Sequence, residues 1–521
     1  MNMFTCYQYC SIDNDSDNRP SNRQYEHGAE FQNMNSKPNQ TSRMWADFIP
    51  LVSLITTFVA RNNGTTDVKP EISSTKVENV TDMLVSPICN FQGNNTNFGE
   101  LSAVCQSFML NLDLKNLLDI AETNYRLSAL AADVFRQKYA NCTVEIDNDR
   151  SLSSESNAIK EINQFPVLMD EWTILVFGLN VSLKLLRNFG PAIQKLTIHN
   201  QRFWVNEEEH EQTIMGFVNE YCAQSLIKLD LQITNPDTMK KLTGPFTNVE
   251  ELGCNVIASD IPEITTHNHA TLNKFFPNIR NLTLSIKSNT NTGFVGSLPQ
   301  LKFLSLRGDT ITPQTISDTR YTQHLMNRNP QIKALKLVFY PPNFVRVVKL
   351  YLPDLESLSL WFFDLGNDRV HFEHVKSFEL LSGIGGSPLK ISFKQLEELR
   401  MWYQPRYAQE WIEFLMMNTH LKRVHVEDYG DNESTLDLES LITQLPNIED
   451  ISILSYKSPH FGTVVKFIET HERLQKFKYG SKNFDEHDIQ YLKKEFSKKW
   501  TISDFNGYYS GLLFERKNST A

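Results

Sequence analysis

Cysteine is scarce in this 521-residue chain, and its distribution is informative. Only seven cysteines occur, none follows Cys254, and no two have the CxxC spacing of many metal and redox sites. Secreted repeat proteins are commonly closed by disulfides, so this pattern favours a reducing compartment. We therefore expect the cytoplasm, with the nucleus as the alternative.

Long apolar runs are also missing. The longest, FIPLVSLITTFVA at Phe48–Ala60, is shorter than the roughly 17 to 25 residues that span a bilayer. It also begins too far into the chain for an ordinary secretory signal. We expect no membrane association, although this apolar island remains a candidate partner-binding segment. A membrane-tethered receptor would need the island to insert and Asn-x-Ser/Thr triplets, such as the one at Asn63, to carry sugar.

No basic cluster offsets the acidic balance of the chain. Lys and Arg number 51 against 61 Asp and Glu, which gives a formal net charge of −10. Nucleic acid and anionic membranes attract basic surfaces, so neither is expected as a partner. A protein partner is the default expectation.

Catalytic and metal-binding motifs are absent or incomplete. EEEHEQT (207–213) and HNH (267–269) lack the two-histidine helical spacing of zinc hydrolases, and the acids of EEEHEQT fit a solvated loop. GIGGSP (383–388) lacks the Lys-Ser/Thr of a phosphate-binding loop, which favours a tight loop instead. We expect no enzyme activity, no metal and no cofactor.

One six-residue pattern, called the phrase below, repeats from about Ile193 onward. It consists of an apolar residue, two mostly polar residues, an apolar residue, one polar residue and another apolar residue. The clearest copies are IRNLTL (279–284), LKFLSL (301–306), IKALKL (332–337), LESLSL (355–360), VKSFEL (375–380), LEELRM (396–401), LKRVHV (421–426) and IEDISI (448–453). Their spacing is typical of leucine-rich repeats. The phrase predicts an α/β fold: a leucine-rich-repeat solenoid of about twelve units, with a curved parallel sheet and helices on its convex side.

Composition divides the chain further. Residues 1–96 are rich in Asn, Ser, Asp and Thr and predict a disordered leader. Residues 97–145 carry helical apolar spacing, with Asp113 as the expected N-cap of one helix. Residues 146–171 read as a linker and cap, and residues 172–515 as the solenoid.

The stretch LNLDLKNLLDIAETNYRLSALAADVFRQKY (110–139) resembles the F-box, a small all-α module that docks on Skp-family adaptors. The order of an F-box-like module followed by repeats is similar to that of the F-box and leucine-rich-repeat proteins, especially divergent insect-type ones. The resemblance implies that a set of leucines lies near the adaptor: Leu101, Leu112, Leu114, Leu117 and Leu118. The usual opening Leu-Pro is missing, since Ser102 follows Leu101. The alternative is a helical cap over the first repeat.

Strand alternation predicts which side chains face a partner. Residues after the second and third apolar positions should point outward and form columns across stacked strands. The outer column supplies the expected target-binding residues: Arg307, Val338, Trp361, Leu381, Trp402 and Glu427. Val338, Trp361, Leu381 and Trp402 form a predicted exposed apolar band about 15 Å long. Alternatively, the strands end early and these side chains pack under loops.

The resemblance implies a role in ubiquitin-dependent protein degradation. In that family the Skp adaptor, and through it a cullin, holds the F-box of an SCF ubiquitin ligase while the solenoid binds a target protein. The alternative is a non-catalytic interaction scaffold unrelated to ubiquitin.

Overall fold

The computed structural model describes most of the chain from residue 105 to residue 517, all within one compact unit at 91–521. The described ranges are 105–107, 109–123, 125–147, 158–163, 172–199, 207–232, 243–256, 271–286, 296–308, 320–340, 344–361, 365, 369–381, 387–403, 407–428, 445–455, 461–481, 485–505 and 510–517. The predicted leader, the apolar island Phe48–Ala60, Leu101 and the HNH sequence lie outside these residues.

Seventeen strands of the described chain form one sheet, most of them parallel. They are β1 (Thr143–Asp147), β2 (Ala158–Asn163), β3 (Trp172–Phe177), β4 (Lys195–His199), β5 (Lys228–Gln232), β6 (Glu251–Val256), β7 (Asn281–Ile286), β8 (Phe303–Arg307), β9 (Ala334–Val338), β10 (Ser357–Trp361), β12 (Ser377–Leu381), β14 (Glu398–Tyr403), β15 (Arg423–Asp428), β16 (Asp450–Ser455), β17 (Lys476–Ser481), β18 (Trp500–Phe505) and β19 (Ser510–Arg516). A separate two-stranded sheet contains β11 (Val370–Phe372) and β13 (Ile391–Phe393).

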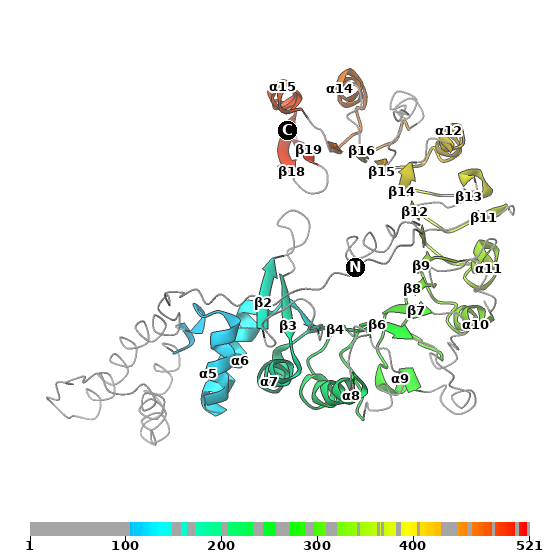
Figure 1. Ribbon diagram of the computed structural model, residues 1–521. Coiled ribbons are helices and arrows are strands. Elements are labelled where there is room, and N and C mark those ends of the chain that lie inside the picture. Colours follow the sequence, from blue (N-terminus) through cyan, green and yellow to red (C-terminus); the bar gives the residue numbers. More distant parts are fainter. Residues whose placement is uncertain are drawn as a thin grey trace, which may run out of the picture. The chain divides into compact units, whose positions relative to one another are not determined.

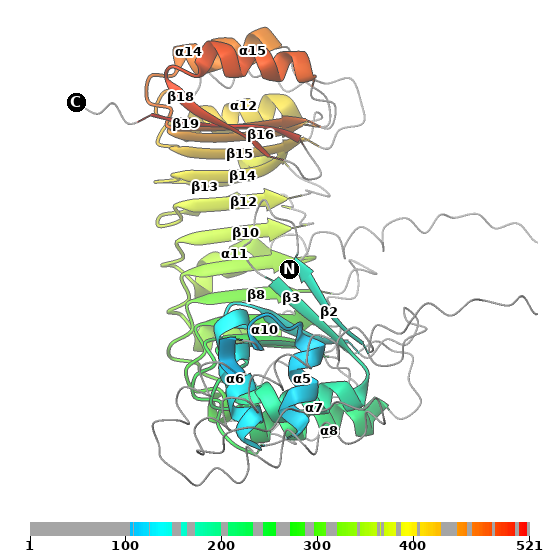
Figure 2. The same ribbon diagram turned by 90° about the vertical axis from the view of Figure 1, so that its left-hand side faces the viewer.

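Neighbouring strands in the main sheet are parallel from β3 to β17. The pairings run β3, β1, β4 and then in chain order through β17. β2 adds antiparallel to β3, and at the other end β19 and β18 turn back antiparallel beside β17. Figure 2 shows the parallel strands as successive rungs.

Helices lie on one side of the sheet, and all but the first two connect one strand to the next (Figure 1). They are α5 (Leu114–Thr123), α6 (Tyr125–Tyr139), α7 (Leu179–Phe189), α8 (Glu207–Phe217), α9 (Thr271–Phe275), α10 (Arg320–Arg328), α11 (Phe344–Tyr351), α12 (Ala408–Met417), α14 (Phe461–Thr470) and α15 (Glu486–Phe496). We call the opposite side of the sheet the helix-free face. The fold is mixed α/β with a large, mostly parallel sheet, an arrangement compatible with a solenoid.

The repeated apolar phrase forms the core between sheet and helices. Leu282, Leu304, Leu335 and Leu358 stand in register on adjacent strands and are buried. Each repeat alone has little apolar surface to enclose, so a continuous spine across strands supplies the stability. The three apolar positions of the phrase were therefore assigned correctly to the core side.

A buried asparagine closes the turn before one repeat. Asn329 is fully buried, and its side-chain N–H groups donate to the carbonyls of Gly296 and Leu325 at 3.1 and 2.8 Å. Its carbonyl oxygen accepts the Leu298 N–H at 2.7 Å. These bonds satisfy backbone groups that a helix end and a loop would otherwise leave unpaired. The same side chain therefore joins one connection to the preceding one.

The N-cap expected at Asp113 is confirmed, and a second acidic cap begins the last helix. The Asp113 carboxylate accepts the Asn116 N–H at 2.8 Å before α5. Asp485 does the same for the His487 N–H at 2.8 Å before α15, whose first turn is acidic and whose last turn is basic. Side-chain capping and favourable charge at each end stabilise the helix.

The helix pair α5–α6 shares the core of the sheet. The ring of Phe135 stacks on Phe189 of α7 with centroids 4.8 Å apart, and both rings are buried. The predicted boundary after residue 145 falls inside β1, which lies between β3 and β4. β2 lies within the stretch expected to be a linker and cap. The helix pair and the sheet are thus continuous through a single apolar core.

Candidate binding surface on the helix-free face

Strand register brings polar side chains from consecutive repeats into one row on the helix-free face. Glu379, Arg400, His425, Ser452 and Lys478 are paired in that order across β12, β14, β15, β16 and β17. Adjacent strands are about 4.8 Å apart, so long side chains from neighbouring positions can reach one another.

Glu379 is the first of two carboxylates around which this row is organised. Its Oε2 accepts the indole N–H of Trp361 at 2.9 Å and a hydrogen bond from the Ser359 hydroxyl. Its Oε1 lies 3.3 Å from Nη1 of Arg400. On the other side, the Lys336 ammonium lies 3.3 Å from the centroid of the Trp361 ring. The Trp361 ring is therefore held by a carboxylate at its edge and a cation at its face.

Glu427 is the second carboxylate, and its side chain is only 4% exposed. It accepts the indole N–H of Trp402 at 3.1 Å and bonds from His425 and Arg400 at 2.8 and 2.9 Å. Burial by itself raises the pKa of the Glu427 carboxyl, but hydrogen bonds and charges from His425 and Arg400 outweigh it and lower that pKa to about 2. Glu427 is therefore a buried, ionised anchor for Trp402.

Arg400 joins the two carboxylates, because Nη1 faces Glu379 while Nη2 donates to Glu427. A planar guanidinium suits this double contact, whereas an ammonium would not span it. We call the connected set the inner network: Lys336, Ser359, Trp361, Glu379, Arg400, Trp402, His425 and Glu427. It extends over five consecutive strands of the sheet, from β9 to β15 in the main-sheet order.

The inner network contains half of the predicted target-binding residues. Trp361, Trp402 and Glu427 belong to it, and Arg307 lies at the end of β8 in register with Val338. The expected exposed apolar band is wrong at two positions, since Val338 is 7% exposed and Leu381 is fully buried. Glu427, expected to be outward-facing, is also buried. Strand alternation gives the face of a side chain correctly but does not determine its exposure.

The sequence-based choice of site residues omitted the charged partners of the tryptophans. Lys336, Glu379, Arg400 and His425 occupy the inner column of the same strands, between the second and third apolar positions. The opposite charges of Glu379 and Arg400 on neighbouring strands were the available signal, because such pairs attract. The contacts to the tryptophan N–H groups depend on rotamers that no pattern specifies.

The leucines predicted to contact an adaptor occupy two different environments. Leu114, Leu117 and Leu118 are at most 4% exposed and belong to the apolar core. As folded here they pack inside the helix pair and offer no free surface, and their place near an adaptor stays a prediction. Leu112 is half-buried and packs at the margin of that core. Any adaptor contact on α5–α6 would therefore use marginal residues such as Leu112, and Leu101 lies outside the described residues.

Other candidate sites remain unsupported in the described part of the chain. EEEHEQT forms the start of α8 instead of the expected loop. Among the residues described, no group of three or more His, Cys, Asp or Glu is placed to hold a metal ion. Within the described chain Cys105, Cys142, Cys222 and Cys254 are buried and form no disulfide, and burial raises the pKa of the Cys222 thiol to about 12. A thiol that stays protonated is a poor nucleophile.

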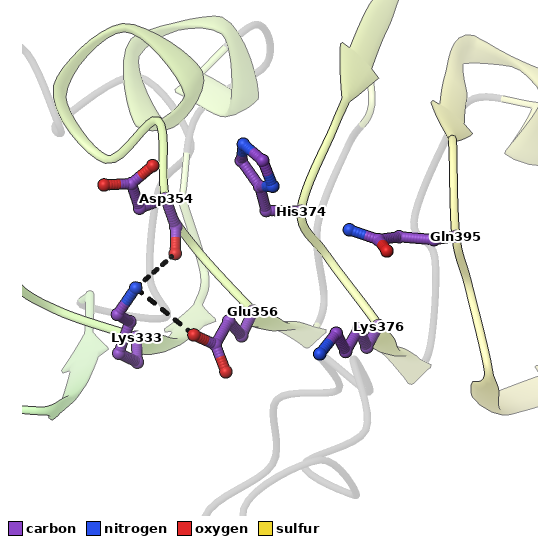
Figure 3. A pocket seen from close by; sticks show the side chains of 6 residues that line it. All are labelled: Lys333, Asp354, Glu356, His374, Lys376 and Gln395. Carbon is purple, nitrogen blue, oxygen red and sulfur yellow. Dashed lines mark hydrogen bonds and ion pairs between the residues drawn. The ribbon is translucent and has the colours of Figure 1, made fainter.

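A shallow polar pocket lies where several strands begin (Figure 3). It is lined by Lys333, Asp354, Glu356, His374, Lys376 and Gln395. The Lys333 ammonium lies 3.2 Å from Glu356 and donates to the Asp354 carbonyl at 3.3 Å. Similar cross-strand ion pairs recur along this edge, for example Lys422 with Glu397 at 3.1 Å. The pocket belongs to a row of solvent-exposed ion pairs between neighbouring strands, and these pairs support the strand register.

Comparison with solved structures found distant structural likenesses. No family model matches the chain, and no curated protein does. A chain in the crystal structure of a complex of Rad7 and Elc1 in yeast is similar over 77% of this chain and 92% of its own, with 14% sequence identity and a TM-score of 0.33. We draw no functional conclusion from a likeness this distant. Within the described residues, no helix has the length and hydropathy needed to cross a membrane.

Proposed function

We propose that this protein is the substrate-recognition subunit of a cullin-type ubiquitin ligase, built as an F-box-like helix pair followed by a leucine-rich-repeat solenoid. The helix pair would dock on a Skp-family adaptor in the cytoplasm or nucleus, and the helix-free face would bind the target. The observation that supports this most is the order of the chain. A two-helix module with F-box-like apolar spacing packs directly on the first units of a repeat sheet through Phe135 and Phe189.

Such an arrangement suits an adaptor that fixes a target relative to a docking module. Because Phe135 and Phe189 are buried in one shared core, a target on the sheet would keep a defined position relative to the helix pair. The protein itself would carry no catalytic step. The inner network supplies half-buried tryptophans and ionised groups, which are common anchors in protein interfaces.

The test is a binding measurement between the full chain and a purified Skp-family adaptor. We expect stable co-elution, and we expect Leu112→Glu to weaken it at least tenfold, because it puts a charge at the margin of α5–α6. The matched control is Leu350→Glu, since Leu350 of α11 is 71% exposed and remote in sequence from the helix pair. Thermal unfolding of both variants separates lost docking from lost folding.

The alternative proposal is a protein-interaction scaffold unrelated to ubiquitin. It is favoured by the burial of Leu114, Leu117 and Leu118, which leaves them no free surface for an adaptor. Absence of adaptor binding by the folded wild-type chain would overturn the ligase proposal and select the scaffold.

A further inference from the structure

Three hydrogen-bond donors on the helix-free face lack partners among the described residues. Nε of Arg400 and Oγ of Ser452 are buried without a hydrogen bond, and Ser452 is 8% exposed as a whole. Lys478, one strand beyond Ser452 in the same register, forms no ion pair within the described chain. Its ammonium lies 4.4 Å from the centroid of the Phe505 ring. Burial lowers the pKa of Lys478, which indicates partial loss of hydration.

Leaving such donors unpaired is costly. A buried polar group without a partner destabilises the fold, and more strongly when it is charged. The nearby carboxylates cannot easily be diverted to them, because Glu379 and Glu427 already accept from Trp361, Trp402 and the Nη atoms of Arg400. The inner network therefore supplies no acceptor of its own for these donors.

The local charge balance defines what that acceptor is. Glu379 and Glu427 are both paired with Arg400, whereas Lys478 forms no ion pair within the described chain. Its charge lies beside the spare hydroxyl donor of Ser452 on the neighbouring strand. Anionic oxygens satisfy both requirements, and charge-assisted hydrogen bonds are the stronger kind.

Apolar groups lie beside the donors, and they favour a peptide ligand over a free ion. Trp402 lies on the same face as Arg400, two residues further along β14. Leu454, Phe505 and Leu513 form a small apolar cluster of their own, apart from the main core, and Phe505 lies beside Lys478. A small inorganic anion would use only the donors, whereas a peptide could use both features.

We propose that Arg400, Ser452 and Lys478 bind the carboxylate of an Asp or Glu in a peptide segment of the target, with an apolar neighbour of that residue against Trp402 or the Leu454–Phe505 cluster. This inference deepens the proposed function, since it assumes that the helix-free face binds the target. It assigns to this face a preference for acidic-apolar segments.

A random peptide library displayed on phage and selected against the full chain tests the proposal. We expect the retained peptides to share an acidic residue beside an aromatic or aliphatic one. For the tightest peptide, made synthetically and measured by fluorescence anisotropy, replacing that Glu or Asp by its amide should raise Kd about tenfold. Retention of no peptide, or of peptides without an acidic preference, overturns the proposal.

Protein variants localise the site. Lys478→Gln should raise the Kd of the same peptide about tenfold, and Ser452→Ala should raise it several-fold without lowering the thermal midpoint, because the lost hydroxyl had no partner. The matched control is Lys228→Gln. Lys228 begins β5, distant along the sheet, and already lies 3.6 Å from Glu251. Equal effects of Lys478→Gln and Lys228→Gln would show long-range charge only and overturn the assigned site.

A further binding measurement distinguishes a carboxylate ligand from a phosphate ligand. Replacing the acidic residue of the peptide by phosphoserine should preserve binding if any anionic oxygen serves, and a marked gain would instead identify phosphopeptides and overturn the carboxylate assignment. Neither measurement involves the adaptor. Peptide binding without adaptor binding would support this inference and overturn the ligase proposal. Adaptor binding without peptide binding would overturn this inference and support the ligase proposal.

Discussion

The indole N–H of Trp402 donates a 3.1 Å hydrogen bond to the buried carboxylate of Glu427. Trp361 makes an equivalent 2.9 Å bond to Glu379, so each tryptophan of the helix-free face is fixed by an acid on a neighbouring strand. Such bonds to ionised acceptors restrict the ring to one orientation. The two tryptophans are therefore preorganised, which reduces the entropy that a partner would lose on binding them.

Glu427 should make stability depend on acidic pH. Its pKa in the folded chain, about 2, is below the ordinary value of 4.5, so the carboxylate stabilises the fold above pH 4.5. This contribution is lost as the pH falls from 4.5 towards 2. We expect Glu427→Gln to lower the free energy of unfolding at pH 7 on the order of 3 kcal/mol. Urea unfolding at pH 7 and thermal unfolding between pH 6 and 3 would measure both effects.

An exposed acid provides the control for that pH dependence. Glu356 pairs with Lys333 at 3.2 Å, but its side chain is 49% exposed. Glu356→Gln should leave stability nearly unchanged at every pH, since solvent screens such pairs. If the gap between wild type and Glu427→Gln stayed constant down to pH 3, Glu427 would not be the ionised anchor described above.

Removing the indole N–H alone should lower the stability of the fold more at Trp402 than at Trp361. Trp402→Phe keeps an aromatic ring but leaves buried Glu427 with one donor fewer, which should cost about 2 kcal/mol. Trp361→Phe should cost less, roughly 1 kcal/mol, because Glu379 is 19% exposed and water can replace the lost donor. Denaturant unfolding of the two variants checks the order, and a larger loss for Trp361→Phe would contradict it.

The repeat pattern was sufficient to predict the core but not the whole order of strands. The phrase at 279–284 places Ile279, Leu282 and Leu284 in the core, and all three are buried. The run AQEWIEFLMM has apolar residues at helical spacing, and α12 spans it at Ala408–Met417 with Trp411, Phe414 and Leu415 buried. Local pattern could not place β1 between β3 and β4, because that pairing depends on contacts distant in sequence.

The candidate site was predictable only in part, for a similar physical reason. Alternation identified the face that carries Trp361 and Trp402, since side chains alternate along any strand. It could not show that Leu381 is buried or that Arg400 bridges Glu379 and Glu427. Those features depend on rotamers and on packing across strands, which a period of two does not contain.

The stacked rings of Phe135 and Phe189 should make the helix pair and the sheet unfold together. Phe135→Ala removes a buried ring and should cost about 3–5 kcal/mol. Hydrogen exchange should then increase in α5, α6 and α7. Arg136→Ala is the neighbouring control, because Arg136 is half exposed and its ion pair with Asp133 lies within its own helix. Faster exchange confined to α5 and α6 would show instead that the module is independent of the sheet.

Gly480 should tolerate no side chain, because the Phe505 ring lies directly against it. A Cβ at this position would come within 2.6 Å of Cζ of Phe505 and 3.2 Å of Leu454. Gly480→Ala should therefore displace the ring and cost about 2 kcal/mol. Gly462 in α14 is the matched control, since a Cβ there meets nothing within 4 Å. Gly462→Ala should stabilise the protein by roughly 0.5–1 kcal/mol through reduced backbone entropy in the unfolded chain. Thermal unfolding should thus show shifts of opposite sign for the two substitutions, and a neutral Gly480→Ala would mean that Phe505 does not pack on β17.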